Sequence, residues 1–255
     1  MWDTDTKAAP EPRLVRILEV DPDLAVDLDA ETSRDATVDL RAPVARIEWE
    51  RNDSRWGPAD PGGHLGLLIV EGVLLREVRL LGTSSAEVLG EGDVVRPWDV
   101  DGAHALPVPA DLHWSVLVPC EVAILGPQFL RRAGRWPEVL ARLAGRCVSR
   151  AQALALHDAL TNLKHVETRL LVQFWHLAER FGRVGLTGIS IQLPLTHEML
   201  GKLVGATRPS VTTALGRLAA RELLVRENGS TWRLSHDSGE ALAPLPVEAD
   251  TQLVA

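Results

Sequence analysis

Cysteine is scarce in this sequence, which has two in 255 residues, Cys120 and Cys147. Their spacing fits no paired metal site and no signal peptide is recognisable, so we expect free thiols in a reducing cytoplasm. An iron–sulfur cluster held by four thiolates of this chain is excluded. No apolar run is long enough to span a membrane, so no membrane partner is expected. No cofactor is implied.

Paired histidines are also missing. A cupin-like metal enzyme needs two histidines one residue apart with a glutamate close behind, and no such pair occurs. His64, His104 and His113 keep open the alternative of a cupin-like metal-dependent enzyme with an accessory helical domain. Isolated histidines are more often solvated or hydrogen-bonded than metal-bound. We therefore predict no catalytic residue, no metal site and no enzymatic activity.

The length of 255 residues and a hydrophobic content of 45% suffice for a sizeable core and favour two domains. Residues 1–12 are polar and proline-bearing, and they predict a disordered lead-in. We expect a β domain over 13–135, a dimerisation helix over 136–163 and a DNA-binding domain over 164–236. Residues 237–255 are rich in proline, alanine and acids and predict a flexible tail.

The β domain shows short apolar or alternating runs. Short helices are expected over 14–28, strands over 37–41 and 44–49, and a loop over 52–63. Further strands, separated by glycine and proline turns, are predicted at 65–70, 72–81, 86–89, 94–98, 112–118 and 121–125. Strands of this length and spacing are typical of a jelly roll.

A long helical pattern follows, opened by Trp136-Pro137. About 27 helical residues would span about 40 Å. A second copy could cover the apolar stripe, although the helix could also pack only on its own barrel; Arg150 and His157 lie near this seam. The stripe consists of Leu140, Leu143, Cys147, Ala151, Leu154, Leu156, Leu160 and Leu163.

A second amphipathic helix is predicted over 164–182, joined to the first by a hinge near residues 163–165. Residues 182–188 contain three glycines and predict a flexible link.

Two short helices with a sharp turn between them are predicted next. Thr196 is a helix N-cap, and Gly205 ends that helix. Thr207 caps a second helix that continues to about Leu218, with Pro209 in its first turn, where a missing N–H costs nothing. The apolar stripe of the second helix is Val211, Ala214, Leu215 and Leu218. This is helix-turn-helix spacing.

Strand-like runs follow the second helix. Residues 223–225 and 231–234 bracket Glu227-Asn228-Gly229-Ser230, which contains a strong hairpin signal, so the motif is winged. An alternative is a helical hairpin inside the core of an enzyme. This alternative explains the two helices, but it does not explain why the sharp turn, Pro209, the polar helix face and the wing occur together.

The exposed face of the second helix suits DNA. Arg208 is a donor fork for guanine edges, and hydroxyls nearby can bind phosphates or bases. Residues 186–235 carry six basic and three acidic side chains, a net +3, whereas the whole chain is −8 and the remainder therefore −11. Double-stranded DNA is thus the expected partner of this segment. The predicted DNA-binding residues are Thr196, Thr207, Arg208, Ser210, Thr212, Thr213, Arg217 and Asn228.

The run T-H-E-M-L-G-K-L-V-G-A-T-R-P-S-V-T-T-A-L-G-R-L resembles the winged helix of the Crp/Fnr superfamily of bacterial transcription regulators. The resemblance implies a homodimer on an inverted-repeat operator, with RNA polymerase as a further partner. Arg208 and Ser210 fall on positions that commonly contact DNA in the family. Pro209 replaces a residue that is often glutamate, and Thr213 replaces a base-reading arginine, so the half-site sequence is left open.

The segment from Gly63 to Ile124 is similar to the sensory barrel of the same superfamily. The overall fold class is therefore α+β: an N-terminal β jelly-roll domain, a long dimerisation helix and a C-terminal winged helix-turn-helix. In cyclic-nucleotide-binding members a Gly-Glu pair and an Arg-Ser/Thr-Ala run hold the ligand; here those positions are Arg96-Pro97 and Ala110-Asp111. Since an acid repels a phosphate, no response to cyclic AMP is expected.

Two arrangements of the barrel interior stay open. Trp98 either fills the vacated cavity itself, or Arg96 and Trp98 line a modified pocket for an unknown small-molecule effector.

Overall fold

The computed structural model describes residues 13–47, 62–98 and 110–242. The lead-in, most of the 52–63 loop, His104 and the end of the tail lie outside these ranges. The chain forms two compact units, residues 1–158 and 159–255, which are treated separately below. The division falls inside the long helix, before the expected domain boundary at residue 163.

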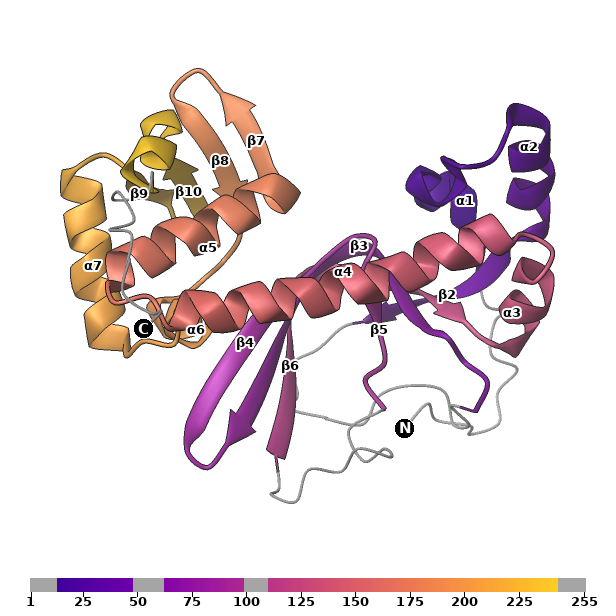
Figure 1. The fold of residues 1–255 in the computed structure, drawn as a ribbon, viewed down its shortest axis with the longest axis horizontal. Helices are drawn as coiled ribbons and strands as arrows, with labels where there is room; N and C mark the ends of the chain where they lie inside the picture. The colour runs from indigo at the N-terminus through magenta and orange to yellow at the C-terminus, as the bar shows by residue number, and fades with distance from the viewer. Residues whose placement is uncertain (1–12, 48–61, 99–109, 243–255) are drawn as a thin grey trace, which may run out of the picture. The chain divides into compact units, whose positions relative to one another are not determined.

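The first unit is an antiparallel sheet flanked by helices (Figure 1). The strand order is β1-β2-β6-β3-β4, and β5 pairs with β3. In chain order the elements are β1 (Leu14–Arg16), α1 (Ile17–Val20), η1 (Pro22–Ala25), α2 (Ala30–Asp39), β2 (Arg41–Ile47), β3 (Gly66–Leu80), β4 (Thr83–Leu89), β5 (Val94–Val95), β6 (Ala110–Leu125), α3 (Pro127–Ala133) and α4 (Pro137–Thr161).

The two central strands are longer than predicted. The strands expected at 65–70 and 72–81 are one strand, β3, and those at 112–118 and 121–125 are β6. Their pairing is irregular between Ile69 and Leu74. Gly72 lies there with φ +94°, and a Cβ on it would stand 2.2 Å from the carbonyl oxygen of Pro119. The glycine and proline therefore mark a bulge within paired strands rather than two strand ends.

The prediction of a strand over 37–41 was wrong for residues 37–39, which end α2. The Asp29 carboxylate caps this helix by accepting from the backbone N–H groups of Glu31 and Thr32 at 2.9 and 3.0 Å. The Thr37 hydroxyl donates to the Ser33 carbonyl at 2.7 Å, an i−4 bond that suits a helix. The alternating pattern becomes a strand only from Arg41 onward.

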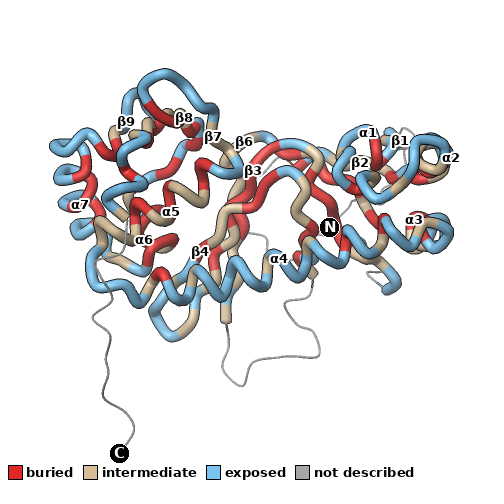
Figure 2. The backbone as a smooth tube through the Cα atoms, turned by 45° about the horizontal axis from the view of Figure 1, so that its top comes forward, coloured by how far each residue is buried: buried red, intermediate tan, exposed pale blue. Residues whose placement is uncertain are grey.

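The central strands of the sheet contain many buried residues, drawn red in Figure 2, and they pack on both faces. Leu67 and Ile69 belong to one hydrophobic cluster together with Trp114. Leu68, one residue away and therefore on the other face, packs in a second cluster with helical residues that include Val139 and Leu143 of α4. The beginning of α4 is thus part of the core of its own unit.

α4 is also attached to the rest of the first unit by charge. Arg142, Arg146 and Arg150 recur every four residues and so share one helix face. Arg142 forms an ion pair with Asp27, with Nη2 2.6 Å from Oδ1. Arg146 donates to Asp21 and to the Gly92 carbonyl, both at 2.6 Å. Three turns of α4 are therefore fixed by acids and carbonyls of the same unit.

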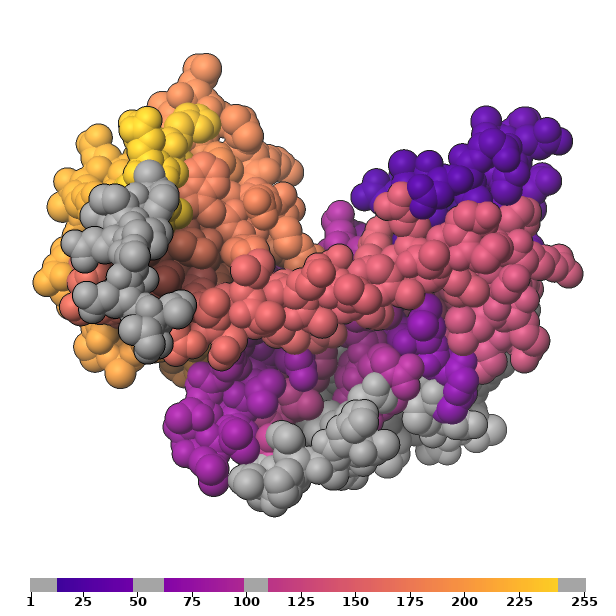
Figure 3. Space-filling view, viewed as in Figure 1, coloured from indigo at the N-terminus to yellow at the C-terminus, as the bar shows by residue number. Residues whose placement is uncertain are grey.

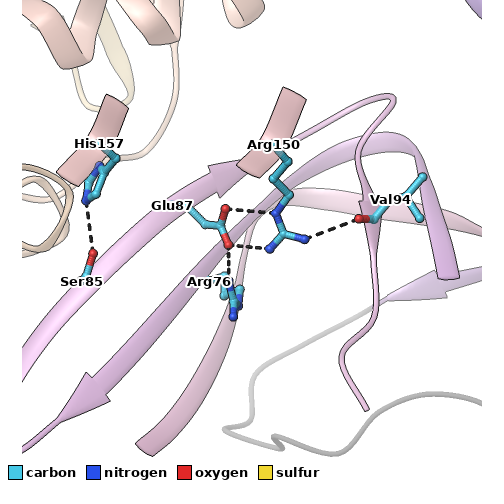
Figure 4. Close-up of polar contacts among 6 residues, drawn as sticks. All are labelled: Arg76, Ser85, Glu87, Val94, Arg150 and His157. Atoms are coloured by element: carbon cyan, nitrogen blue, oxygen red, sulfur yellow. Dashed lines mark hydrogen bonds and ion pairs between the residues drawn. The ribbon is translucent and has the colours of Figure 1, made fainter. Parts of the chain in front are cut away.

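The third arginine belongs to a half-buried network that Figure 4 shows. Arg150 donates to both carboxylate oxygens of Glu87 on β4, at 2.6 and 3.2 Å. Arg76 of β3 donates to the same carboxylate at 2.6 Å. About two turns further along α4, the His157 ring lies 3.2 Å from the Ser85 hydroxyl.

These contacts, together with the burial of two leucines, place part of the predicted dimer seam within the protomer. Arg150 and His157, expected near the seam, face β4. Leu143 and Leu160, which were part of the predicted stripe, are 1% and 4% exposed, so they pack within the protomer. The face of α4 that points away from the arginines carries exposed, mostly small side chains. They are spaced alternately four and three residues apart. This outer face consists of Ala141, Gly145, Val148, Gln152 and Ala155.

The second unit combines helices with an antiparallel sheet of order β7-β8-β10-β9. Residues 182–188, predicted as a flexible link, form β7 and its turn into β8. Residues 237–242, predicted as tail, belong to a 3-10 helix in which Ser238 is buried. After the end of α4 the elements are α5 (Val166–Phe181), β7 (Gly182–Gly185), β8 (Gly188–Gln192), α6 (His197–Val204), α7 (Arg208–Ala220), β9 (Leu224–Asn228), β10 (Thr231–Leu234) and η3 (His236–Leu242).

Trp232 lies at the centre of this unit. Its side chain is 1% exposed, its ring centroid is 5.0 Å from that of Phe174, and its Nε1–H donates to the Leu193 carbonyl at 3.2 Å. The indole thus joins β10 to α5 and to the segment that leads into α6.

Candidate nucleic-acid interface

The two helices of the motif begin and end where the sequence predicts. The Thr196 hydroxyl accepts from the Met199 backbone N–H at 3.2 Å, and the Thr207 hydroxyl accepts from the Ser210 N–H at 3.4 Å. Gly205 ends α6 with φ +61°, the left-handed conformation that favours glycine. Pro209 stands in the first turn of α7. Local capping chemistry therefore sets both the turn and the start of the second helix.

α7 has one buried and one exposed face. Val211, Ala214, Leu215 and Leu218 are 8% exposed or less and fix the helix on its unit. Arg208, Pro209, Thr212, Thr213 and Gly216 are exposed. The helix therefore presents a polar surface with its N-terminal arginine free of the core.

The predicted hydroxyl contacts lie on this surface and are hydrogen-bonded locally. Thr212 and Thr213 donate to the carbonyls four residues earlier, at 3.0 and 3.1 Å. The hydroxyls of Ser210 and Thr207 are 2.9 Å apart. Each hydroxyl oxygen keeps acceptor capacity, and a rotation of χ1 would turn it outward as a donor.

Two predicted contacts lie elsewhere on the unit. Arg217, nearer the end of α7, forms an ion pair with Glu167 of α5 at 2.9 Å, and its side chain is 69% exposed. Asn228 is exposed at the end of β9, opposite Thr231 in the hairpin. The hairpin tip is held by Arg226, whose Nε donates to the Gly229 carbonyl at 2.9 Å and whose guanidinium lies 5.0 Å from the Trp232 ring.

His197 belongs to this surface and was not predicted. It is the first residue of α6, and its Nδ1 lies 2.8 Å from the Thr212 hydroxyl of α7. Burial lowers the pKa of His197, and the charges of Arg226 and Arg208 lower it further. The available signal in the sequence was its position: His197 directly follows the helix cap Thr196 and precedes a helix that carries basic residues.

Comparisons with known proteins identify this motif. Residues 168–237 match the family model of the Crp-like helix-turn-helix domain. The regulatory protein CysR of Synechococcus elongatus is 39% identical over 61 residues, which are 23% of this chain and 30% of CysR. The chain thus spans about a third of that relative's length.

Solved structures extend the likeness to the fold of both units. A transcriptional regulator of the CRP/FNR family from Thermus thermophilus is 18% identical, with a TM-score of 0.56 over 78% of this chain and 97% of that chain. FixK2 from Bradyrhizobium japonicum is 18% identical, with a TM-score of 0.56 over 75% and 92%. A cyclic nucleotide-binding domain containing protein from Listeria monocytogenes is 17% identical, with a TM-score of 0.60 over 76% and 90%.

The chain has the Crp/Fnr fold and a Crp-like helix-turn-helix domain. The predicted resemblance to this superfamily and the predicted fold class are therefore confirmed.

Within the Crp/Fnr fold, the predicted effector residues lie beside the sheet. Arg96 is exposed, and its Nη1 donates to the carbonyls of His64 and Leu65 at 2.7 and 3.2 Å. Trp98 packs against the cluster that contains Leu67 and Ile69, 5.6 Å from the Arg96 guanidinium carbon. Trp98 is thus partly buried against the sheet, with Arg96 beside its ring.

Metal and membrane sites receive no support from the described residues. Within residues 13–47, 62–98 and 110–242, no group of three or more histidine, cysteine or acidic side chains could hold a metal ion. Burial, followed by the charges of Glu71 and Glu121, raises the pKa of Cys120 to about 12, so this residue is a neutral thiol. None of the described helices is long and apolar enough to cross a membrane.

Proposed function

We propose that this chain is a sequence-specific transcription regulator that binds an inverted-repeat operator as a homodimer. The observation that carries the proposal is α7: a helix capped by Thr207, buried along Val211 to Leu218, with Arg208 exposed at its N-terminal end. A B-DNA major groove admits one such helix, and its first residues reach the base edges. The net charge of +3 over 186–235 supports the same partner.

The proposal of a homodimer is based on the outer face of α4. Its small side chains would allow a second α4 to approach closely, and the spacing of four and three is that of a coiled-coil seam. Figure 3 shows α4 at the surface along its length. Because the arginine row holds the other side of α4 to its own unit, the outer face is the side left for a partner.

Arg208→Ala tests the docking of α7. We expect the affinity for a duplex selected from a random pool to fall by about 1–3 kcal/mol, because one bidentate base contact per half-site is lost. Preference at one base pair per half-site should relax. Arg221→Ala, at the far end of α7, is the matched control and should reduce the affinity for all sequences alike. Selected sites without dyad symmetry would contradict the model, as would an unchanged affinity of Arg208→Ala.

His197 predicts a pH dependence. In the free protein its pKa is lowered by burial and by Arg226 and Arg208; nearby DNA phosphates would raise it again. A proton is then taken up on binding, so the DNA affinity should rise as the pH falls from the bound-state to the free-state pKa.

The DNA affinity should change by at most about tenfold per pH unit for each histidine that takes up a proton. Titration by fluorescence anisotropy from about pH 8 to about pH 5.5, around the ordinary histidine pKa of about 6.5, measures it. His197→Gln should remove the slope. A wild-type slope equal to that of this variant would refute the assignment.

Cyclic AMP should neither bind nor change the DNA affinity. A cyclic phosphate would need a cation or several N–H donors in place of its hydration. Arg96 donates to two backbone carbonyls, and Asp111, at the aligned phosphate position, is an exposed acid on β6. Calorimetry with cyclic AMP on the wild type and Arg96→Ala decides this; micromolar binding by the wild type would overturn the expectation. RNA polymerase and an unknown small effector remain partners that the family resemblance suggests.

A further inference from the structure

Arg169 lies in the first turn of α5 and donates to three backbone carbonyls. Its Nε is 2.6 Å from the Leu163 oxygen, and its Nη1 is 3.3 Å from that of Val204 and 3.0 Å from that of Gly205. All of these residues belong to the second unit. A single guanidinium therefore connects the segment that follows α4 with the C-terminal end of α6.

Two of these carbonyls, those of Val204 and Gly205, stand at the end of a helix, where helix geometry leaves carbonyls without partners. The last carbonyls of a helix have no intrahelical donor, and a cation near them is favoured by the helix dipole. Val204 ends α6 and Gly205 is its cap. Arginine suits this position because its planar fork addresses two directions at once, which the single ammonium of lysine cannot reproduce.

A second contact closes the same junction. Gly205 lies so near the last residue of α4 that a Cβ on it would stand 3.2 Å from both Cβ and Cγ2 of Thr161. The backbone conformation of Gly205, φ +61°, determines the direction in which the chain leaves α6 toward α7. The end of α4 and the helix-turn-helix turn are therefore in van der Waals reach.

The first turn of α5 also holds the other end of α7. Glu167, two residues before Arg169, forms the 2.9 Å ion pair with Arg217. The turn before α7 and the C-terminal half of α7 are thus both bound by the first turn of α5, through Arg169 and Glu167 respectively. The segment at 163–165, expected from the sequence to be a hinge, is tied to α6 through Leu163.

We propose that Arg169 is a positioning residue for DNA recognition: it fixes the helix-turn-helix turn, and with it α7, to the segment that follows α4. This inference rests on the proposed DNA-binding function. Arg169 is expected to touch no base; it would act through the orientation of Arg208 and its neighbours. Its loss should therefore affect sequence discrimination more than the general attraction between a basic surface and phosphates, which tolerates changes in orientation.

The experiment compares two duplexes of equal length with the full chain: one selected by the wild type from a random pool, and one of scrambled sequence. For Arg169→Gln we expect the affinity for the selected duplex to fall about 3- to 30-fold. The affinity for the scrambled duplex should stay within about twofold, since phosphate contacts dominate non-specific binding. A variant that merely unfolds would lower both affinities by the same factor.

Three further variants sharpen the result. Arg169→Lys should recover part of the discrimination, because one ammonium can bind either the Leu163 carbonyl or the Val204 and Gly205 carbonyls. Gly205→Ala leaves the charge unchanged but presses on Thr161, and should lower the same ratio. Arg180→Gln, at the other end of α5, is the control and should leave the ratio unchanged.

An Arg169→Gln protein with the wild-type ratio would overturn the inference, as would an equal loss in Arg180→Gln. If the wild type itself does not distinguish the two duplexes, the proposed function fails instead, and the two outcomes are therefore separable.

Discussion

Val148→Glu should convert the homodimer into a monomer and lower the affinity for a palindromic duplex by about 100- to 10,000-fold. Val148 is 58% exposed at the middle of the outer face of α4. In a dimer through this face, the two new carboxylates would meet in a desolvated seam, where like charges repel strongly. The loss in DNA binding follows because the second half-site contact is intramolecular only in a dimer.

Leu154→Glu is the matched control. Leu154 is 40% exposed and belonged to the leucine stripe that the sequence suggested as the seam, but it points to the side of α4 away from Val148. Sedimentation velocity should give a dimer for Leu154→Glu and a monomer for Val148→Glu. The reverse result would restore the leucine seam, and a dimeric Val148→Glu protein would exclude the outer face.

The helix-turn-helix was predictable because its determinants are local. Thr196, Gly205, Thr207 and Pro209 act within four residues of their own positions, through hydrogen bonds and allowed φ values. The buried stripe from Val211 to Leu218 follows from helical period alone. Residues of this kind give a reliable prediction without knowledge of the rest of the fold.

Long-range contacts were beyond the same reasoning. Nothing near Glu87 in the sequence indicates that Arg76 and Arg150 share its carboxylate. The face of α4 that packs on its own unit depends on those partners, which the helical periodicity of the sequence does not indicate. Arg169 was missed for a similar reason, because its acceptors are backbone carbonyls up to 36 residues away, and a carbonyl has no sequence signature.

The sequence also predicts turns at a glycine and a proline, although both lie inside strands of the sheet. Gly72 and Pro119 oppose one another in neighbouring strands and produce a bulge in β3 and β6. A local rule assigns each of them to a turn, whereas the pairing of the strands decides that both stay within the sheet.

Glu87→Ala should lower the free energy of unfolding of the first unit by about 3–5 kcal/mol, because it leaves two half-buried arginines without their carboxylate. The side chain of Glu87 is 15% exposed, and those of Arg76 and Arg150 are 24% and 22% exposed. Hydrogen exchange of the β4 and α4 segments measures the loss in this unit alone. The variant should also dimerise less well, since α4 then loses its ion pair to β4 and keeps the contacts of Arg142, Arg146, His157 and its apolar start.

The charge of Glu87 can be separated from its shape by Glu87→Gln and by pH. Burial would raise the pKa of Glu87, but the hydrogen bonds and charges of Arg150 and then Arg76 outweigh it, so the pKa lies below its ordinary value. The stabilisation by the carboxylate is therefore complete above the ordinary glutamate pKa and is lost as the pH falls through the lowered one. Wild type and Glu87→Gln should differ most in protection of α4 near neutral pH and converge in acid. Equal protection at neutral pH would show that the arginines need no carboxylate, and α4 would then be held to the sheet by Val139 and Leu143 rather than by charge.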